Sequence, residues 1–484
     1  MNKLFNLILV IFFLFFFSCN NDDGNSASSR SVNDFVWKGL NSWYYWKPQV
    51  SDLQDNRFNS NRDYESFING KTPENLFFSL LYNYPNDDQF SWIVDDVNAL
   101  LERFSGIETT NGMDFYLFRH SGSNQALAGI VNYVVPGSSA ALQGIKRGDV
   151  FFAVNGSPLN TNNYLQLYDH QVSITFANDA AMNSNELIFS GAYEKHLIAQ
   201  QLEINPVHYA TVFDGNQRRA GYLVYNGFKA NYNDELNAVF GEFRNAGITD
   251  LILDLRYNRG GSLPSALALA QMITGRFTGS PFVRLDFNDS HNSLDKQFNF
   301  ESQMTIYNFV NGQNVPAGTQ SINSLNLNNV YILTTANTAS ASELIISGLD
   351  AYIDVVVIGS ETRGKFVGSR TLVDHPASDF MDISQRSRLH NYAMQPIVFA
   401  YFNAQNEIFL SGIQADYNIS FSQYVGTLGN FGDPNSDAAL ANALSVIGGF
   451  SSRTNLPVYE HIQQYVSTKE LQEIGKELYL EPGS

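Results

Sequence analysis

The spacing of hydrophobic positions changes twice along the chain, and each change predicts a different kind of domain. Between residues 32 and 104, apolar residues recur every three or four positions, as in VNDFVWKGLNSWYYW, and Pro73 stands near the start of a second such run, TPENLFFSLLY. This spacing is typical of amphipathic helices, and proline is favoured in a first helical turn. We therefore expect residues 32–104 to form a small helical domain.

From residue 105 to residue 205 the pattern changes to short strands separated by glycine and asparagine. In AGIVNYVVPGSSAALQGIKRGDVFFAVNG, the apolar run 129–135 predicts a strand, and 138–143 predicts a short helix with Gly144 as its C-terminal cap. A second strand in this stretch ends at an Asn-Gly turn. These features predict a β-rich domain over 105–205.

From residue 206 to residue 450, continuous apolar runs alternate with amphipathic ones. The runs DLILDLRYN, VYILTTA and DVVVIGS predict buried strands, and DELNAVFGEFRNAG and SELIISGLDAY predict helices between them. Such alternation is typical of a mainly parallel sheet covered on both faces, where ligands gather at the carboxyl ends of the strands. We therefore predict a multidomain α/β protein with its core at 206–450, followed by a tail or helix at 451–484.

The first residues, MNKLFNLILVIFFLFFFSCNNDD, predict export of the chain. Their apolar run is too short for a membrane span but suits a signal peptide over 1–18. A small residue precedes Cys19, the only cysteine, which resembles a bacterial lipobox in which this cysteine becomes lipidated. We expect a tether at 19–31 and a lipid anchor in the outer membrane, on its periplasmic or cell-surface face. A plain secretory signal and an uncleaved anchor are the alternatives.

Charge and composition narrow the range of partners. The 484 residues carry a formal net charge of −18, whereas nucleic-acid binding needs clustered Lys and Arg. We therefore expect no nucleic-acid partner, and contact with a membrane only through the N-terminal anchor. The sequence contains no Cys/His cluster, no H-E-x-x-H motif and no phosphate-binding loop, so we expect neither a metal nor a cofactor.

The stretch TANTASASE, 335–343, carries the first candidate for chemistry. It follows a predicted strand and begins a predicted helix, so its hydroxyls lie beside the free N–H groups of a first helical turn. Such donors can stabilise an oxyanion, which makes Ser340 a candidate nucleophile. The alternative is ordinary capping, because Ser340 and Glu343 have the spacing of a capping box.

Two further motifs stand at the ends of neighbouring predicted strands. Lys365 lies in the glycine-flanked loop of IGSETRGKFVGS, where a desolvated lysine would lose its proton more easily and accept one from serine. In LILDLRYNRGGS, Gly260 and Gly261 permit a turn, and one of their amides together with that of Ala341 would form an oxyanion hole. A surface lysine and an ordinary turn are the alternatives.

Together these motifs resemble those of the C-terminal-processing (tail-specific) serine peptidases, in which LDLR, ASASE and GK motifs follow a PDZ domain. The resemblance implies a ClpP/crotonase-like core and a Ser-Lys dyad. It also implies Ser340 rather than Ser342 as the nucleophile, because Lys365 follows Ser340 by the family's 25 positions. The family often has a glutamine four residues after the lysine; Ser369 stands there and is a candidate to support Lys365. The Asp-rich start also resembles that of Bacteroidetes surface lipoproteins.

The β-rich domain resembles a PDZ domain through its VVPGSSAALQGIKRGDVFFAVNG stretch. The resemblance implies a carboxylate-binding loop near 111–118, where we expect Gly112, Met113, Asp114 and Phe115 to bind a peptide terminus. A rigid spacer is the alternative for this domain.

The predicted function is that of a secreted serine endopeptidase that cleaves proteins or peptides near their C-termini through an acyl-enzyme. Its expected partners are polypeptides with apolar C-terminal tails. A Ser-His-Asp triad built on His375 or His390 is a rival mechanism, although no G-x-S-x-G elbow occurs. The alternative function is that of a catalytically weak or inactive protein that captures peptide tails through the PDZ-like domain.

Overall fold

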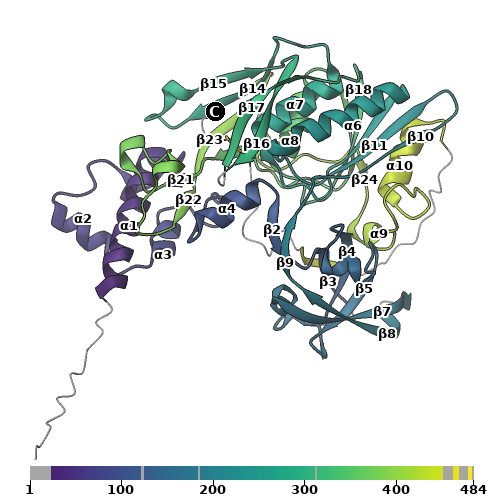
Figure 1. Cartoon of the computed structure of the whole chain (residues 1–484), viewed down its shortest axis with the longest axis horizontal. Coiled ribbons are helices and arrows are strands. Elements are labelled where there is room, and N and C mark those ends of the chain that lie inside the picture. The colour runs from purple at the N-terminus through teal and green to yellow at the C-terminus, as the bar shows by residue number, and fades with distance from the viewer. Residues whose placement is uncertain are drawn as a thin grey trace, which may run out of the picture.

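The structure is a computed structural model that describes residues 23–120, 125–183, 186–310, 313–450, 462–467 and 478–481. Figure 1 shows three parts: N-terminal helices on one side, an α/β core, and a β-rich module below the core. The multidomain α/β architecture that the sequence predicts is confirmed. The predicted signal peptide and Cys19 lie outside the described residues.

The N-terminal part is helical, as its hydrophobic spacing predicts. Its helices are α1 (Asp23–Trp43), α2 (Asn61–Ile68), α3 (Pro73–Ser79) and α4 (Val97–Phe104). α1 buries Phe35, Val36 and Leu40 in the same hydrophobic cluster as elements of the core, so this part packs onto the core rather than standing apart. Because α1 begins at Asp23, residues 23–31, expected to be a tether, lie in this helix.

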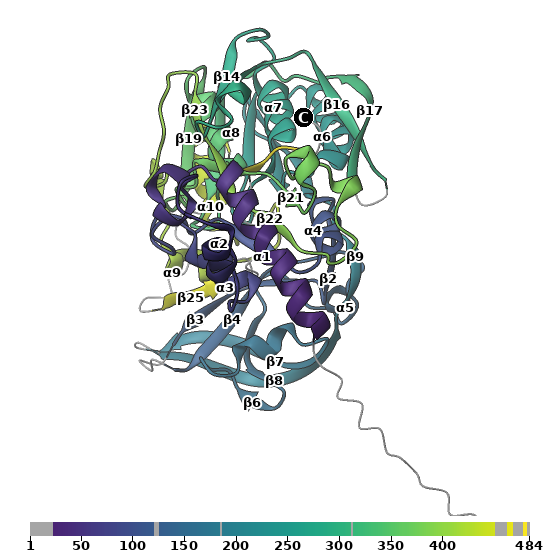
Figure 2. The same ribbon diagram turned by 90° about the vertical axis from the view of Figure 1, so that its left-hand side faces the viewer.

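The β-rich module is built on one sheet whose strands run in the order β25-β3-β4-β5-β7-β8. Its elements are β2 (Ile107–Thr110), β3 (Met113–Arg119), β4 (Leu127–Val134), α5 (Ser139–Leu142), β5 (Val150–Val154), β6 (Ser157–Pro158), β7 (Gln171–Asn183), β8 (Glu186–Ile198), β9 (Gln200–Glu203) and β25 (Gln463–Ser467). The predicted strand and short helix are present, and Gly144 lies just beyond the helix with a φ of +75°. The edge strand β25 comes from much later in the sequence, and Figure 2 shows it beside β3.

The core contains the predicted sheet of mainly parallel strands, in the order β10-β11-β12-β18-β19-β24, in which only β10 is antiparallel to its neighbour. The strands are β10 (Val207–Asp214), β11 (Arg219–Tyr225), β12 (Asp250–Asp254), β18 (Asn329–Thr334), β19 (Asp354–Gly359) and β24 (Tyr417–Asn418). The helices are α6 (Asn233–Ala246), α7 (Leu263–Thr274), α8 (Ala341–Asp350), α9 (Phe421–Val425) and α10 (Ala438–Ile447). Leu251 and Leu253 pack with residues of α6–α8, and Ile252 packs with residues of α10. The sheet is therefore covered on both faces.

A second six-stranded sheet, in the order β13-β26-β20-β23-β14-β15, was not predicted from the sequence. Its strands are β13 (Gly261–Ser262), β26 (Leu478–Tyr479), β20 (Val367–Ser369), β23 (Ile397–Asn403), β14 (Pro281–Phe287) and β15 (Lys296–Asn299). In a small three-stranded sheet, β22 (Ala393–Gln395) lies between β1 (Trp92–Val94) and β21 (Leu372–Val373). β16 (Gln303–Val310) pairs with β17 (Gln313–Ser321). The described residues of the predicted tail thus enter two different sheets.

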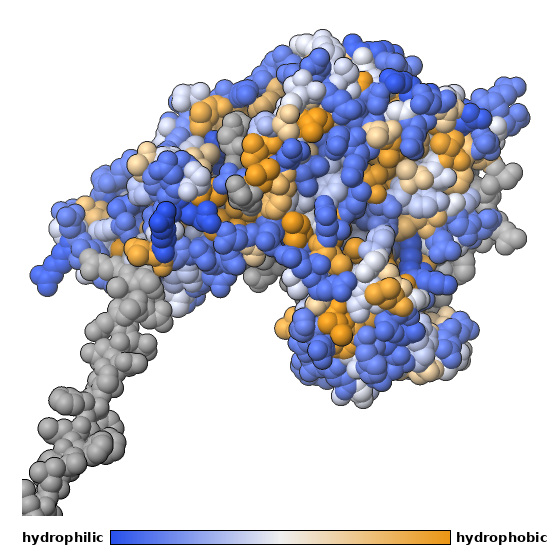
Figure 3. Space-filling view, in the orientation of Figure 1, coloured by the Kyte–Doolittle hydropathy of each residue, from blue (hydrophilic) through white to orange (hydrophobic). Residues whose placement is uncertain are grey.

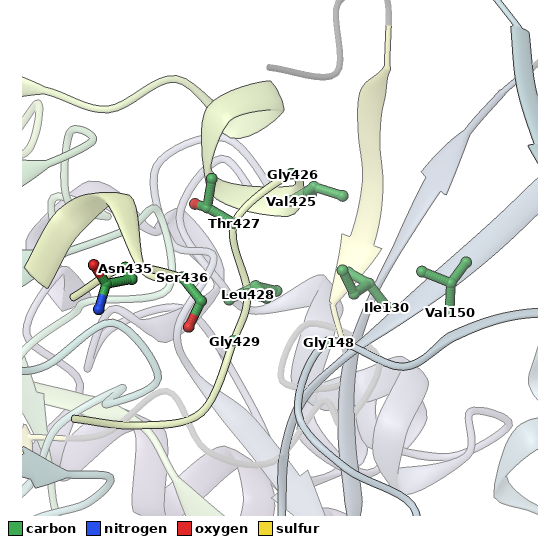
Figure 4. A pocket seen from close by; sticks show the side chains of 10 residues that line it. All are labelled: Ile130, Gly148, Val150, Val425, Gly426, Thr427, Leu428, Gly429, Asn435 and Ser436. Carbon is green, nitrogen blue, oxygen red and sulfur yellow. The ribbon is translucent and has the colours of Figure 1, made fainter. Parts of the chain in front are cut away.

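Within the described ranges, every helix is too short or too polar to cross a bilayer. Figure 3 shows hydrophobic side chains in scattered groups on a largely hydrophilic face, several of them at the junction between the core and the β-rich module. At that junction, a cavity of about 270 Å³ lies between the module and the loop after α9 (Figure 4). Ile130 and Val150 line its module side, and 425–429 line its core side.

A buried cluster of charges joins the β-rich module to the core. Arg256, just after β12, donates to Asp254 at 2.6 Å and to Asp437 at 2.7 Å, and Arg147 of the module donates to Asp437 at 2.9 Å. Burial opposes ionisation of Asp437, but the two arginines outweigh it and lower the pKa of this carboxyl to about 2. The charged residues of LDLR therefore hold the module against the core, beside the turn that follows them.

Candidate active site

The three sequence motifs meet at the carboxyl ends of β12, β18 and β19. The loop after β18 and the first turn of α8 bind the loop after β12, because Ala339 N and Ser342 Oγ both donate to Asn258 O, at 3.2 and 3.0 Å. The loop after β19 joins them through Arg363 N, which donates to Thr338 O at 3.0 Å. Parallel neighbouring strands thus bring the motifs to one edge of the sheet, as their order in the sequence predicts.

Ser340 is the residue that caps α8, and its backbone is strained. Its φ of +63° lies in a region that costs a non-glycine residue about 1–3 kcal/mol. The side chain is fully buried, and no described acceptor receives a hydrogen bond from its Oγ. A serine held in such a conformation, with its hydroxyl proton uncommitted, is a stronger candidate for chemistry than a serine that only caps a helix.

Lys365 lies in the loop between β19 and β20, and its side chain is also fully buried. The preceding residue, Gly364, has a φ of +83°, and a Cβ there would meet Gly412 N at 2.7 Å and Leu410 O at 2.8 Å. Only glycine permits the loop at residue 364 to pack this closely against the backbone of residues 410–412. This packing fixes the conformation of the loop that carries Lys365. Lys365 Nζ lies 5.4 Å from the centroid of the Phe90 ring, which belongs to the N-terminal part of the chain.

The carboxylate of Glu343 ties Ser340 to Lys365. Its Oε2 accepts hydrogen bonds from the backbone N–H groups of both residues, at 2.7 Å from Ser340 and 2.9 Å from Lys365. Its Oε1 accepts from Gly364 N and from Thr362 Oγ1, each at 2.6 Å. Burial raises the pKa of Glu343, although these hydrogen bonds lower it. One buried side chain therefore fixes the spacing of the proposed nucleophile and base.

The hydroxyl of Tyr401, on β23, makes a second tie between the same two residues. It lies 3.0 Å from Ser340 O and 2.8 Å from Lys365 O. Glu343 thus accepts from both N–H groups, while the single O–H of Tyr401 lies within hydrogen-bond distance of both carbonyls and is shared between them. The Tyr401 side chain is buried, and burial with the nearby Glu343 carboxylate raises its pKa well above the usual range. It therefore stays protonated and able to donate.

The proposed oxyanion donors lie at the start of β13 and of α8. The N–H of Gly260 donates to Asn258 Oδ1 at 2.8 Å, so its use for an oxyanion requires that bond to be released. Gly261 has a φ of +139°, and a Cβ there would lie 2.1 Å from Phe228 O, so glycine is required at this position. Ala341 is the first residue of α8, where backbone N–H groups lack helical acceptors.

The remaining predicted support for Lys365 and the predicted peptide-binding loop have partners of their own. Ser369 is buried, and its Oγ donates to Leu478 O at 3.4 Å; its support of Lys365 stays a prediction. The N–H groups of Gly112 and Met113 each donate, at 3.0 Å, to the side chain two residues earlier. Asp114 accepts from an asparagine on β4, and Phe115 packs in the core of the module. The expected loop is wrong for most of its length, because Met113, Asp114 and Phe115 lie in strand β3. Peptide binding by these residues stays a prediction.

The two histidines of the rival triad have other described partners. His375 Nδ1 lies 2.9 Å from Ser378 Oγ, and His390 Nε2 lies 3.1 Å from Asp374 Oδ2. The ring of His390 also stacks on Phe35 of α1. Ser340 is not among the partners described for either ring, and the choice between Lys365 and a histidine as its base stays a prediction.

Three residues of this neighbourhood were not predicted in their positions. Gln89 accepts a hydrogen bond from Arg363 at 2.7 Å, and Phe90 lies near the lysine, so the N-terminal part contributes directly to the site. Tyr401 lies on a strand of the sheet that was not predicted. The capping-box spacing pointed to Glu343, but only as a partner of Ser340.

Comparisons with known proteins show what the chain is similar to. A model described as "Peptidase family S41" matches residues 219–418, and one described as "Peptidase S41 N-terminal domain" matches residues 31–92. Over 302 residues the chain is 24% identical to a chloroplastic C-terminal processing peptidase of Tetradesmus obliquus, covering 60% of this chain and 58% of the relative. Over 232 residues it is 23% identical to a carboxyl-terminal-processing protease of Picosynechococcus sp., covering 48% of this chain and 49% of the relative. The chain therefore matches only about half the length of these relatives.

A solved structure of a putative S41 protease from Bacteroides fragilis superposes with a TM-score of 0.66 at 24% sequence identity. The match covers 85% of this chain and 96% of the other, and it shows that the fold is shared. The two matching models fall on the N-terminal helices and on the core that holds Ser340 and Lys365. By these matches and by its fold, the chain belongs to peptidase family S41.

Proposed function

We propose that the chain is a serine endopeptidase that cleaves polypeptides near their C-termini, with Ser340 as nucleophile and Lys365 as general base. The proposal rests on the hydrogen bonds of Glu343 and Tyr401 to the backbones of Ser340 and Lys365. These bonds hold the two proposed catalytic residues at a fixed spacing in the protein interior. A nucleophile and its base need such preorganisation, because small displacements between reacting groups slow the reaction strongly.

In the proposed reaction, Ser340 Oγ attacks the scissile carbonyl carbon while its proton passes to neutral Lys365 Nζ. Full burial of the lysine removes its hydration and favours the uncharged amine. Backbone N–H groups of Ala341 and of the Gly260–Gly261 turn stabilise the oxyanion. Lys365 then gives the proton to the leaving amine, which departs as the C–N bond breaks. Water attacks the Ser340 ester with Lys365 again as base, releasing the new carboxyl terminus.

Hydrolysis of an unfolded protein such as reduced casein tests this proposal. We expect Ser340→Ala and Lys365→Ala each to abolish cleavage, and His390→Ala and Ser342→Ala to keep most of it. Loss of activity in Ser342→Ala as complete as in Ser340→Ala would undo the choice of nucleophile. A chain that binds peptide tails but cleaves nothing would instead be the capture protein that the same fold can support.

We also propose that the chain is exported and anchored by a lipid on Cys19, and that the β-rich module binds apolar C-terminal tails. The pattern of the leader supports the first point, and the arrangement of β3, β4 and α5 in the module supports the second. Export and anchoring predict that the wild-type chain sediments with membranes and takes up a labelled fatty acid. Cys19→Ala should lose the label; uptake by that variant would contradict the assignment.

A further inference from the structure

A strand from late in the sequence lies between two strands of the proposed active site. β26 pairs in parallel with β13, where Leu478 is opposite Gly261 and Tyr479 is opposite Ser262, and it also pairs with β20, where Tyr479 is opposite Ser369. β13 carries one candidate oxyanion donor, and β20 begins two residues after Lys365. The segment 478–481 thus fills a strand-wide gap whose two walls are both parts of the proposed site.

The chain direction of β26 is the one that a substrate strand would need in order to bring a peptide bond to the proposed catalytic residues. Because β13 and β26 are parallel, the chain in the gap moves away from Gly260 as it passes from Leu478 towards Leu480. A substrate strand in the same gap would therefore place the bond nearest the oxyanion donors just before the Leu478 position. The residues that follow the cleaved bond would then lie along β13, where 478–481 lie now.

The surroundings of the side chains of residues 478–481 indicate which residues of a bound peptide would fit this gap. Leu478 and Leu480 enter the main hydrophobic cluster of the core. Tyr479 stacks on Phe104 with ring centroids 4.3 Å apart. Glu481 is buried and accepts a hydrogen bond from Asn314 at 3.2 Å. The gap therefore suits an extended peptide with apolar, aromatic and apolar residues in succession, followed by an acidic or polar one.

A second segment occupies the edge of the β-rich sheet. β25 pairs antiparallel with β3, the strand that contains most of the segment 111–118 predicted to bind a carboxylate (Figure 2). Tyr465 packs edge-on against Tyr164 at 5.6 Å between ring centroids. At the other end of β25, Ser467 donates to Asn337 Oδ1 at 3.1 Å, three residues before the proposed nucleophile. A strand added to this edge is the mode in which sheet edges take peptides.

We propose that the gap between β13 and β20 and the edge of β3 are two binding sites for extended polypeptide. In the described state, 478–481 and Gln463–Ser467 fill them from within the same chain, so the enzyme blocks itself. The identity of the competing ligand, a polypeptide substrate, rests on the proposed peptidase function. Substrate enters the catalytic gap only when 478–481 leaves it.

The block depends on pH through Glu481. Burial raises the pKa of this carboxyl to about 7 from an ordinary 4.5, although hydrogen bonds from Ser262 and Asn314 and the charge of Lys229 lower it. Tyr307 also faces Glu481 and is neutral in this range. Between about pH 4.5 and 7 the docked carboxyl holds a proton that the undocked one releases, so docking weakens as pH rises through that window, by up to about tenfold per pH unit.

A reversible crosslink tests the block by comparing the same protein with β26 held in the gap and with β26 released. In the Ser262→Cys/Tyr479→Cys double variant, a disulfide would hold β26 in the gap, since these residues are paired across β13 and β26. We expect the oxidised protein to cleave casein at least tenfold more slowly than the same protein after dithiothreitol, while each single variant is unaffected by the reductant. Equal rates before and after reduction, or failure of the pair to crosslink, would overturn the proposal.

Peptide binding tests the same gap independently of catalysis. A fluorescent peptide with the sequence of residues 476–484, KELYLEPGS, is titrated into Ser340→Ala protein with and without Tyr479→Ala, which removes the stack on Phe104. We expect at least tenfold tighter binding when Tyr479→Ala is present, tighter at pH 5.5 than at pH 8, and no binding of a scrambled peptide. The matched control Tyr417→Ala changes an exposed tyrosine and should bind no better than the parent.

The outcomes separate this inference from the proposed function. If the peptide binds but no variant cleaves casein, the two polypeptide-binding sites are supported and the proposed peptidase activity is refuted. Casein cleavage that the crosslink and Tyr479→Ala leave unchanged, together with no peptide binding, would make β26 a permanent part of the sheet and overturn the inference. A Tyr479→Ala protein that melts lower and neither binds peptide nor gains activity would overturn it too.

Discussion

The replacement Glu343→Gln isolates the tie between Ser340 and Lys365 with almost no change in shape. Each carboxylate oxygen of Glu343 accepts two hydrogen bonds, and Oε2 serves the N–H groups of both proposed catalytic residues. A glutamine has only one acceptor oxygen. If its amide nitrogen takes the Oε2 position, it meets two N–H donors and can accept from neither.

The size of the effect follows from those contacts. Hydrogen bonds to a charged group contribute about 1.5–3 kcal/mol each, so loss of two removes about 3–6 kcal/mol. Relief from burying a charge offsets part of this, and we expect the free energy of unfolding to fall by about 2–4 kcal/mol. Since displacement of reacting groups by about 1 Å can cost roughly 100-fold in rate, we expect kcat to fall by about that factor.

Two measurements separate positioning from general destabilisation. Urea unfolding gives the change in stability, and the rate of cleavage is measured at a temperature where circular dichroism shows the variant to be folded. Glu361→Gln, an exposed change in the same loop, is the control and should alter neither quantity. A folded Glu343→Gln protein with wild-type kcat would refute the positioning role of this carboxylate.

Three further changes are expected to give defined results. Two arginines hold the pKa of Asp437 at about 2, against an ordinary 3.8. This carboxylate therefore contributes about 2 kcal/mol of stability above pH 4, and the contribution is lost as pH falls towards 2. Urea unfolding of Asp437→Asn should lack that pH dependence. Gly261→Ala places a Cβ 2.1 Å from a backbone oxygen and should lower the free energy of unfolding by about 3 kcal/mol or more. The control Gly227→Ala meets only ordinary contacts and should lower it by less than about 1 kcal/mol in the same urea unfolding assay. Tyr401→Phe removes the hydroxyl between two carbonyls and should lower stability by about 1–3 kcal/mol and kcat with it; an unchanged kcat would show that the carbonyl tie does not serve the reaction.

Much of the core could be predicted because local patterns and tertiary contacts agree there. The strands β12, β18 and β19 are continuous apolar runs, and a buried parallel strand must be apolar on both sides. α6 ends at Ala246, and the next residue, Gly247, has a φ of +65°, the left-handed conformation that glycine permits. The order of the motifs then placed Ser340 and Lys365 at one edge, since parallel strands end together.

The second sheet could not be predicted in the same way. β13, β20 and β26 are two or three residues long and come from regions more than 100 residues apart, so no local period marks them. Tyr401 and Phe90 reach the site through such long-range packing, and nothing in their neighbours along the chain indicates it. The second role of Glu343 was hidden because its local role as a capping partner already explained the spacing.

Mass spectrometry of the protein after reaction with a fluorophosphonate probe tests the Ser340–Lys365 mechanism most directly. The mechanism predicts one adduct, on Ser340, formed by the wild-type protein and lost in Lys365→Ala at neutral pH. The Ser342→Ala protein should still form the adduct on Ser340. An adduct on Ser342, or labelling of Ser340 at an unchanged rate in Lys365→Ala, would contradict the dyad.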